Sequence, residues 1–177
     1  RAVLAANLET ALNGVWDARP HVGDRISVIG AGTVGCLAAW LASRIAGCDV
    51  ELVDVNPRRA AVAAVLGVRF AEPAAAAREA DLVIHASGAP AGLEQALQIA
   101  ADEATIVELS WFGDQTVPLS LGGAFHARRL TIASSQVGRV APSQRLRWDT
   151  PRRMQLALTL LDDPALDALI TGENEFE

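Results

Sequence analysis

The feature that most constrains this chain is a glycine-rich turn between a short apolar run and a helical segment. Residues 26–29 have the length and composition of a buried strand, and residues 30–35 (Gly-Ala-Gly-Thr-Val-Gly) follow at once. Apolar residues at helical spacing then continue towards Gly47. A strand that turns directly into a helix is typical of parallel α/β proteins. Because glycine-rich turns are common, the interpretation depends on the rest of the chain.

The rest of the chain alternates in the same way between short apolar runs and helical segments. We predict strands over residues 26–29, 50–53, 68–70, 82–85, 105–109 and 130–133, and helices over 4–16, 34–45, 57–66, 73–80, 91–101 and 152–161, with a last extended piece at 166–170. Strands separated by helices pair in parallel through right-handed crossovers. The sequence therefore predicts an α/β fold with a doubly wound, six-stranded parallel sheet (a Rossmann fold) in the order 3-2-1-4-5-6.

Composition excludes several classes of protein. All 15 basic residues are arginine, and the chain contains no lysine or tyrosine. A P-loop and a Schiff-base enzyme both need lysine, and the Tyr/Lys pair of short-chain dehydrogenases cannot be assembled. The net charge of −6 argues against nucleic acid, and no apolar run is long enough to cross a membrane. Cys36 and Cys48 form no C-x-x-C pair, so we expect ordinary thiols in a cytoplasmic protein.

The three glycines of the turn each have a physical role in dinucleotide binding. Gly30 permits the tight turn, Gly32 lets the backbone approach a pyrophosphate, and Gly35 allows close packing of the helix on the strand. The N-terminus of the helix offers free N–H groups and a partial positive charge to the diphosphate. Asp54 lies 19 residues beyond Gly35, at the end of the second strand, and is expected to accept hydrogen bonds from ribose hydroxyls.

The acidic residue also favours one cofactor. A carboxylate at Asp54 repels a 2′-phosphate, which favours NAD over NADP. Arg58 and Arg59 lie one helical turn further on and offer an alternative, a clamp for that phosphate, or else they are solvated surface residues. We predict NAD, with Arg59 contacting the edge of the ribose.

A second group of candidates lies where the fourth predicted strand ends. Ser87 and Gly88 would let the cofactor pass close to the backbone beside Gly30. His85 is either a proton-transfer group or a strand-end histidine bonded to backbone, and we favour the second. His21 and His126 have no partners at metal-ligand spacing, so no metal site is predicted. The arginines of residues 139–153 are interpreted as a solvated face.

Longer stretches around these motifs resemble the zinc-type medium-chain alcohol dehydrogenase superfamily. The resemblance is carried by residues 8–15 (Leu-Glu-Thr-Ala-Leu-Asn-Gly-Val) and 22–35 (Val-Gly-Asp-Arg-Ile-Ser-Val-Ile-Gly-Ala-Gly-Thr-Val-Gly), then by residues 53–56 and by 81–84 leading to Ser87-Gly88. It covers nearly all of the chain. It implies the coenzyme-binding domain, as a fragment, of a zinc-dependent NAD-linked alcohol or polyol dehydrogenase.

The resemblance places the rest of the enzyme outside this chain. In that family a separate N-terminal domain supplies the zinc ligands and most of the pocket for the alcohol or ketone substrate. We therefore expect zinc only in that domain, no catalytic or metal-binding residue here, and a chain that is inactive alone. Residues 1–177 are expected to be a single NAD-binding domain: a lead-in helix and loop at 1–24, the core at 25–150, and a final helix and return towards the missing domain at 151–177.

The resemblance also implies where the cofactor would contact this chain. It places the diphosphate at Gly30, Gly32, Thr33, Val34 and Gly35, the ribose at Asp54 and Arg59, the adenosine side at Ala86, Ser87 and Gly88, and the carboxamide near Leu109 and Ser110. Glu108, Trp111 and Phe112 depart from the small residues or proline of the family pattern at the nicotinamide end. A homodimer is expected through a sheet edge near Val117–Leu121, where apolar residues alternate.

Two other functions share some of these features. A regulatory NAD-sensing Rossmann module without catalysis would have the same glycine turn and acidic residue, but it would begin at the first strand. The 24-residue lead-in argues against it. A methyltransferase also uses glycines and a strand-end acid, but it would not require Gly35.

Overall fold

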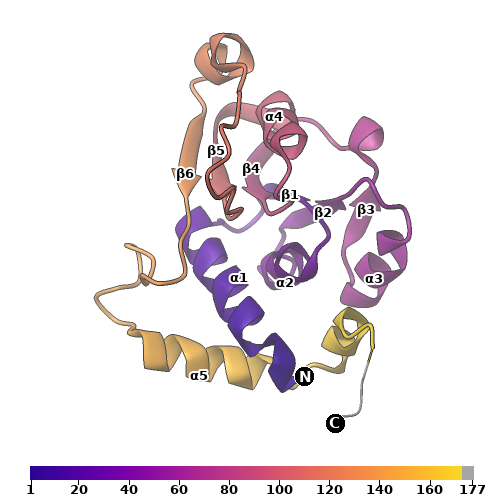
Figure 1. The fold of residues 1–177 in the computed structure, drawn as a ribbon, viewed down its shortest axis with the longest axis vertical. Coiled ribbons are helices and arrows are strands. Elements are labelled where there is room, and N and C mark those ends of the chain that lie inside the picture. Colours follow the sequence, from indigo (N-terminus) through magenta and orange to yellow (C-terminus); the bar gives the residue numbers. More distant parts are fainter. Residues whose placement is uncertain (173–177) are drawn as a thin grey trace.

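The sheet has the predicted architecture. The computed structural model describes residues 1–172, and its six strands are all parallel, in the order β3-β2-β1-β4-β5-β6 (Figure 1). The strands are β1 (Arg25–Ile29), β2 (Asp49–Val53), β3 (Arg69–Ala71), β4 (Ala80–His85), β5 (Ala100–Glu108) and β6 (Thr131–Ser134). The order of the strands reverses between β1 and β4, so their carboxyl ends border the crevice in which ligands of such sheets bind.

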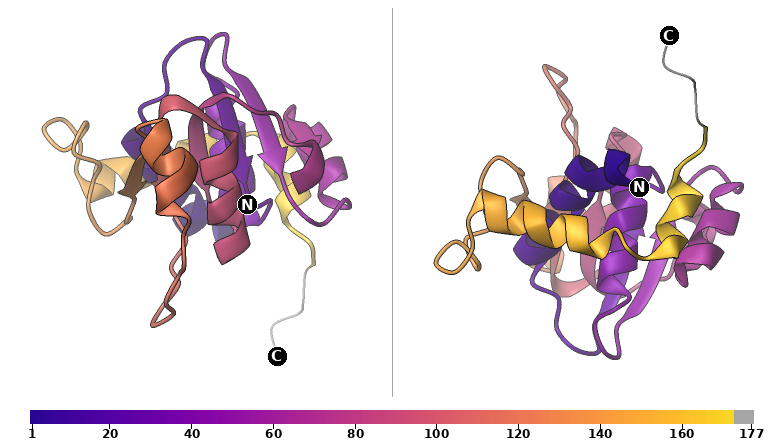
Figure 2. Two further views of the ribbon diagram at one scale, coloured as in Figure 1. Left: turned by 90° about the horizontal axis from the view of Figure 1, so that it is seen from above. Right: turned by 90° about the horizontal axis from the view of Figure 1, so that it is seen from below.

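Helices cover both faces of the sheet. They are α1 (Ala5–Ala18), α2 (Thr33–Ala42), α3 (Arg59–Leu66), α4 (Pro90–Ile99) and α5 (Thr150–Leu160), with short helical turns at Ala2–Leu4, Pro73–Ala75, Leu121–Phe125 and Pro164–Leu169. One apolar core joins the sheet to α1, α2, α3 and α5, and a second joins the opposite face to α4. The view from below in Figure 2 shows α5 and the Pro164–Leu169 turn outside the helices α1, α2 and α3, which cover that face of the sheet. No helix of residues 1–172 is long and apolar enough to span a bilayer.

Three predicted elements differ from the structure. The alanine-rich helix predicted at 73–80 is only a single turn, Pro73–Ala75, because the Ala77 N–H donates to the Glu51 carboxylate at 2.8 Å and β4 begins at Ala80. The extended piece predicted at 166–170 lies mostly in the turn Pro164–Leu169. Its helical geometry is favoured by Pro164 in its first turn and by the Asp163 side chain, which accepts from the Ala165 N–H.

The third difference concerns the predicted sheet edge. Residues 114–120 form no strand in the described chain, and β6 is the outermost strand on that side. Val117 and Leu119 pack against the core beneath α4, and the Ser120 N–H donates to Glu94. The alternation of apolar residues therefore reflects packing of an irregular segment rather than an edge strand. The homodimer itself stays a prediction.

Close backbone packing fixes α2 against the sheet. A Cβ atom at Gly35 would lie 1.8 Å from the Gly30 carbonyl oxygen. A Cβ at Gly30 would lie 2.6 Å from the backbone N and Cα of Ser87, and Gly30 has a φ of +105°. At these two positions only glycine fits the observed backbone.

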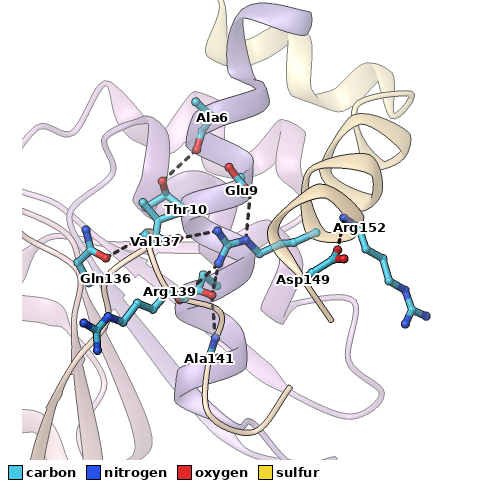
Figure 3. Close-up of polar contacts among 12 residues, drawn as sticks. Ala6, Glu9, Thr10, Gln136, Val137, Arg139, Ala141, Asp149 and Arg152 are labelled. Carbon is cyan, nitrogen blue, oxygen red and sulfur yellow. Dashed lines mark hydrogen bonds and ion pairs between the residues drawn. The ribbon is translucent and has the colours of Figure 1, made fainter. Parts of the chain in front are cut away.

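A buried arginine attaches α5 to α1. The Arg153 side chain is 1% exposed and donates to Glu9 at 3.1 Å, to the Asn13 side chain at 2.5 Å and to the Val137 carbonyl at 2.5 Å. Figure 3 labels Glu9 and Val137, the partners from α1 and from the segment before α5. The Asn13 oxygen also accepts from the Ala141 N–H. The arginines of residues 139–153 are therefore not all on a solvated face, because this one neutralises a buried glutamate.

Replacing Gly35 by alanine is expected to destabilise the fold by about 3 kcal/mol, because the new Cβ meets the Gly30 carbonyl, which is backbone and cannot move aside. Gly32→Ala is the matched control, since Gly32 has a φ of −71° and a Cβ there meets open space. Its cost is expected to stay within about 1 kcal/mol, the loss of a favourable cap residue. Urea unfolding of both variants measures the difference, and equal stability would contradict the packing argument.

Replacing Arg153 by methionine is expected to lower the free energy of unfolding by about 3–5 kcal/mol, because it leaves the buried Glu9 carboxylate unpaired. Arg145→Met removes an exposed arginine nearby and should change stability by no more than about 0.5 kcal/mol. Adding Glu9→Gln to Arg153→Met should recover part of the loss, since the unpaired charge disappears. An Arg153→Met variant as stable as the Arg145→Met control would show that the ion pair is not needed.

Candidate functional site

A cavity of about 630 Å³ opens at the carboxyl ends of β1, β2 and β4. Five of the predicted cofactor-binding residues line it: Gly30, Gly32, Asp54, Ala86 and Ser87. Its remaining wall includes the apolar residues Ile29, Val53, Pro73, Ala74 and Ala91. Such a site, apolar with a few polar groups converging on it, is typical of small-molecule and cofactor pockets.

The turn presents the N-terminus of α2 to this cavity. Gly32 is the N-cap residue of α2, and the first helical hydrogen bond runs from the Cys36 N–H to the Gly32 carbonyl. The N–H groups of Thr33, Val34 and Gly35 belong to the first turn, where a helix provides no partner. Of the predicted diphosphate-binding residues, Gly30 and Gly32 line the cavity and Thr33, Val34 and Gly35 do not. The arrangement suits an anion such as a diphosphate.

Asp54 connects the turn to β2. One carboxylate oxygen accepts from the Ala31 N–H at 2.6 Å, and the other accepts from the Asn56 N–H at 2.8 Å. A carboxylate oxygen has two lone pairs, so each oxygen can accept a further hydrogen bond from a ligand. Asp54 is half-buried and lines the cavity. It can therefore bind hydroxyl groups and will repel phosphate.

Arg58 and Arg59 lie at the start of α3, just beyond Asp54. The Arg58 N–H donates to the Asn56 side chain, and Arg59 is the first residue of the helix. Among the described residues that line the cavity, neither arginine is present. The structure therefore brings Arg59 near the candidate site without placing it on the wall.

Gly88, Leu109 and Ser110 lie next to the cavity rather than on its wall. The Gly88 N–H donates to the Ser110 hydroxyl at 3.0 Å, which joins the ends of β4 and β5. Leu109 packs beneath α1, where its side chain occupies the space a Cβ of Gly14 would need. Leu109 and Ser110, which follow β5, are both half-buried.

Three side chains lie within hydrogen-bond distance of the His85 ring, and the longest contact joins its Nδ1 to the Ser110 hydroxyl oxygen at 3.4 Å. His85 Nδ1 lies 2.6 Å from Glu108 Oε2, and its Nε2 lies 2.6 Å from the hydroxyl oxygen of Ser87. The ring is fully buried and stacks on Phe112 with centroids 6.2 Å apart. The favoured interpretation of His85 as a histidine bonded to backbone is therefore wrong. Glu108, which sequence reasoning noted only as a departure from a pattern, is its partner.

The strand register explains this pair. His85 and Glu108 are the last residues of β4 and β5 and lie directly opposite each other. Aligning the two predicted strands by their first residues, Leu82 and Thr105, would have placed His85 opposite Glu108. The β4 residues facing α4 alternate, so His85 follows the buried Val83 on that face.

The thiols and the other histidines add no reactive centre. Burial raises the pKa of the Cys36 thiol to about 11, so it is not a nucleophile near neutral pH. Cys48 donates a hydrogen bond to the His21 carbonyl. Within residues 1–172 no three His, Cys, Asp or Glu side chains are arranged to hold a metal ion. A zinc site therefore does not fit this part of the chain.

Comparison with solved structures supports the fold. Galactitol-1-phosphate dehydrogenase from Escherichia coli has a TM-score of 0.74 at 22% identity, with 92% of this chain and 49% of that chain covered. A zinc-binding dehydrogenase from Sinorhizobium meliloti 1021, bound to NADP, has a TM-score of 0.72 at 20% identity, covering 88% of this chain and 47% of that one. A short chain alcohol dehydrogenase from Escherichia coli CFT073, complexed with NADH, has a TM-score of 0.75 at 18% identity, covering 95% and 50%.

This chain spans about half the length of these similar proteins. Their low identity makes the likeness one of fold. The sequence itself gives the family, because the family model described as zinc-binding dehydrogenase matches residues 33–152, more than half of the chain. The chain belongs to the zinc-binding dehydrogenase family.

Proposed function

We propose that this chain is the coenzyme-binding domain of a zinc-dependent, NAD-linked alcohol or polyol dehydrogenase. The observation that carries the proposal is the cavity, which combines an apolar wall, the N-terminus of α2 and the Asp54 carboxylate. These three features match the adenine, diphosphate and ribose of a dinucleotide. Family membership supports the same function.

We propose that the coenzyme contacts the residues predicted from the sequence, five of which line the cavity. The diphosphate would lie at Gly30 and Gly32 and at the N–H groups of Thr33, Val34 and Gly35, where no side chain stands between backbone and ligand at Gly32. Asp54 would accept the ribose hydroxyls, with Arg59 at the edge. Ala86, Ser87 and Gly88 would border the adenosine side, and Leu109 and Ser110 would lie towards the carboxamide. The bound nicotinamide supplies hydride transfer, while the residues here bind and orient it.

The substrate and the metal would be held elsewhere in a longer protein. We propose that groups outside residues 1–172 bind the zinc and the alcohol or ketone substrate; within the described residues no cluster of metal ligands is found. The similar solved chains are about twice as long as the part that this chain covers. We therefore propose that this chain alone binds coenzyme without turning over substrate.

Isothermal titration tests the proposal directly. NADH is expected to bind, NADPH to bind more weakly because of Asp54, and S-adenosylmethionine not to bind. Gly32→Ala should weaken NADH binding by about tenfold or more, equivalent to about 1.4 kcal/mol, because its Cβ would stand on the cavity wall while the fold stays intact. Binding of S-adenosylmethionine without NADH would reject the dehydrogenase function.

The choice between cofactors rests on one carboxylate. Asp54→Asn is expected to shift the ratio of NADPH to NADH affinity by about tenfold towards NADPH, since it removes the negative charge but keeps an acceptor for Ala31 or Asn56. Asp114→Asn removes an exposed carboxylate from a loop and is the matched control. An unchanged ratio in Asp54→Asn would show that this residue does not select the cofactor.

A further inference from the structure

We propose that Ser87, His85 and Glu108 form a serine–histidine–glutamate triad, and that the Ser87 hydroxyl is a nucleophile towards small uncharged carboxylic esters. The reaction requires no coenzyme, but it uses the cavity proposed for the coenzyme, so NADH and the ester are expected to compete. It rests on three side chains brought together by the ends of two neighbouring strands, β4 and β5.

The distances match those that a nucleophile and its base require. The Ser87 oxygen lies 2.6 Å from His85 Nε2, and His85 Nδ1 lies 2.6 Å from Glu108 Oε2. A nucleophile, a base and a third group that orients the base, all within hydrogen-bond reach, define this kind of centre in unrelated folds. The other Glu108 oxygen accepts from the Ser110 N–H at 2.6 Å, which holds the carboxylate in place.

The direction of the hydrogen bonds follows from the carboxylate. An ionised Glu108 can only accept, so His85 Nδ1 must carry the proton that faces it. In the neutral imidazole Nε2 then has a free lone pair, and it accepts the hydroxyl proton of Ser87. This assigned tautomer is the one in which histidine acts as a general base towards serine.

The surroundings protect the base and expose the nucleophile. His85 is 0% exposed, whereas Ser87 is exposed and lines the cavity. Gly92 in α4 leaves the necessary space, because a Cβ there would lie 2.5 Å from the Ser87 oxygen and 2.7 Å from His85 Nε2. The buried His85 and the largely buried Glu108 interact more strongly than the same two groups would in water.

The start of α4 supplies one backbone donor for the developing oxyanion. The helix begins at Pro90, three residues after Ser87, and no side chain of residues 1–172 caps it. Pro90 has no N–H, and the Gly92 N–H donates to the Ala89 carbonyl at 3.0 Å. The Ala91 N–H is therefore the first-turn donor without a partner within the helix, and Ala91 lines the cavity together with Ser87. Backbone N–H groups aimed at a carbonyl oxygen are the usual means of stabilising a tetrahedral intermediate.

The reaction balances without any further reagent. The Ser87 oxygen attacks the ester carbonyl carbon while its proton passes to His85 Nε2, and Glu108 stabilises the imidazolium. The bond to the leaving alcohol breaks, and that alcohol takes the proton from His85, which leaves an acyl group on Ser87. Water then attacks the acyl carbon and gives a proton to His85, the carboxylic acid leaves, and Ser87 regains its proton. The apolar walls of the cavity favour a short acyl chain.

The experiment measures p-nitrophenol release from p-nitrophenyl acetate by the intact chain. The absence of lysine removes the commonest source of background acylation. We expect an initial burst, an acetyl group located on Ser87 by peptide mass spectrometry, and labelling of the same residue by a fluorophosphonate. Ser87→Ala, His85→Gln and Glu108→Gln should each lower the rate by about 100-fold or more. Ser143→Ala is the matched control, because its hydroxyl donates to the Trp16 carbonyl instead.

The outcomes separate this inference from the proposed function. Lack of a burst and of fluorophosphonate labelling in the folded chain would overturn the triad, as would a rate unchanged by Ser87→Ala. Denaturant unfolding of each variant identifies a loss that comes from misfolding, and labelling of the unaltered chain does not depend on any variant. NADH binding is measured on the same sample. Failure to bind NADH would remove the coenzyme function alone, while failure to react would remove the triad alone.

Discussion

The contact between three backbone segments at Gly30 is the constraint on which the candidate site depends. The carbonyl of Gly30 occupies the place where a side chain at Gly35 would begin, and its Cα lies against the backbone of Ser87. The Gly30 N–H donates to the Val53 carbonyl, so β2 is joined at the same point. The ends of β1, β2 and β4 and the first turn of α2 are thus held together by atoms that cannot move independently. A cavity bordered by all four follows from this contact.

Charged side chains support the arrangement at two places, the glycine turn and the contact between α5 and α1. Asp54 accepts from Ala31 and Asn56, so the carboxylate that would bind a ligand also holds the glycine turn. Between α5 and α1, Arg153 donates hydrogen bonds to the side chains of Glu9 and Asn13 and thereby fixes α5 across α1. Each buried charge has a partner of opposite sign or several hydrogen bonds, as burial requires. Asp54 therefore holds the glycine turn against the end of β2, and Arg153 holds α5 against α1.

The sequence was sufficient for those features that depend on local pattern. Apolar runs separated by helical segments predict the six strands and their order, and the spacing from Gly35 to Asp54 predicts a carboxylate beside the turn. Features decided by distant residues were missed. The helix predicted after Pro73 is interrupted by Glu51, which is 26 residues away from the N–H it binds. Arg153 was interpreted as solvated because its partner lies 144 residues earlier.

The pairing of His85 with Glu108 shows how a departure from a family pattern can carry information. A glutamate at the end of β5 is unfavourable by itself, since its side chain is only 13% exposed and a charge there needs a partner. A histidine at the end of β4, fully buried, has the same requirement. In register across two parallel strands, each satisfies the other. The two residues are therefore one unit, and the second nitrogen of the imidazole, Nε2, faces the exposed hydroxyl of Ser87.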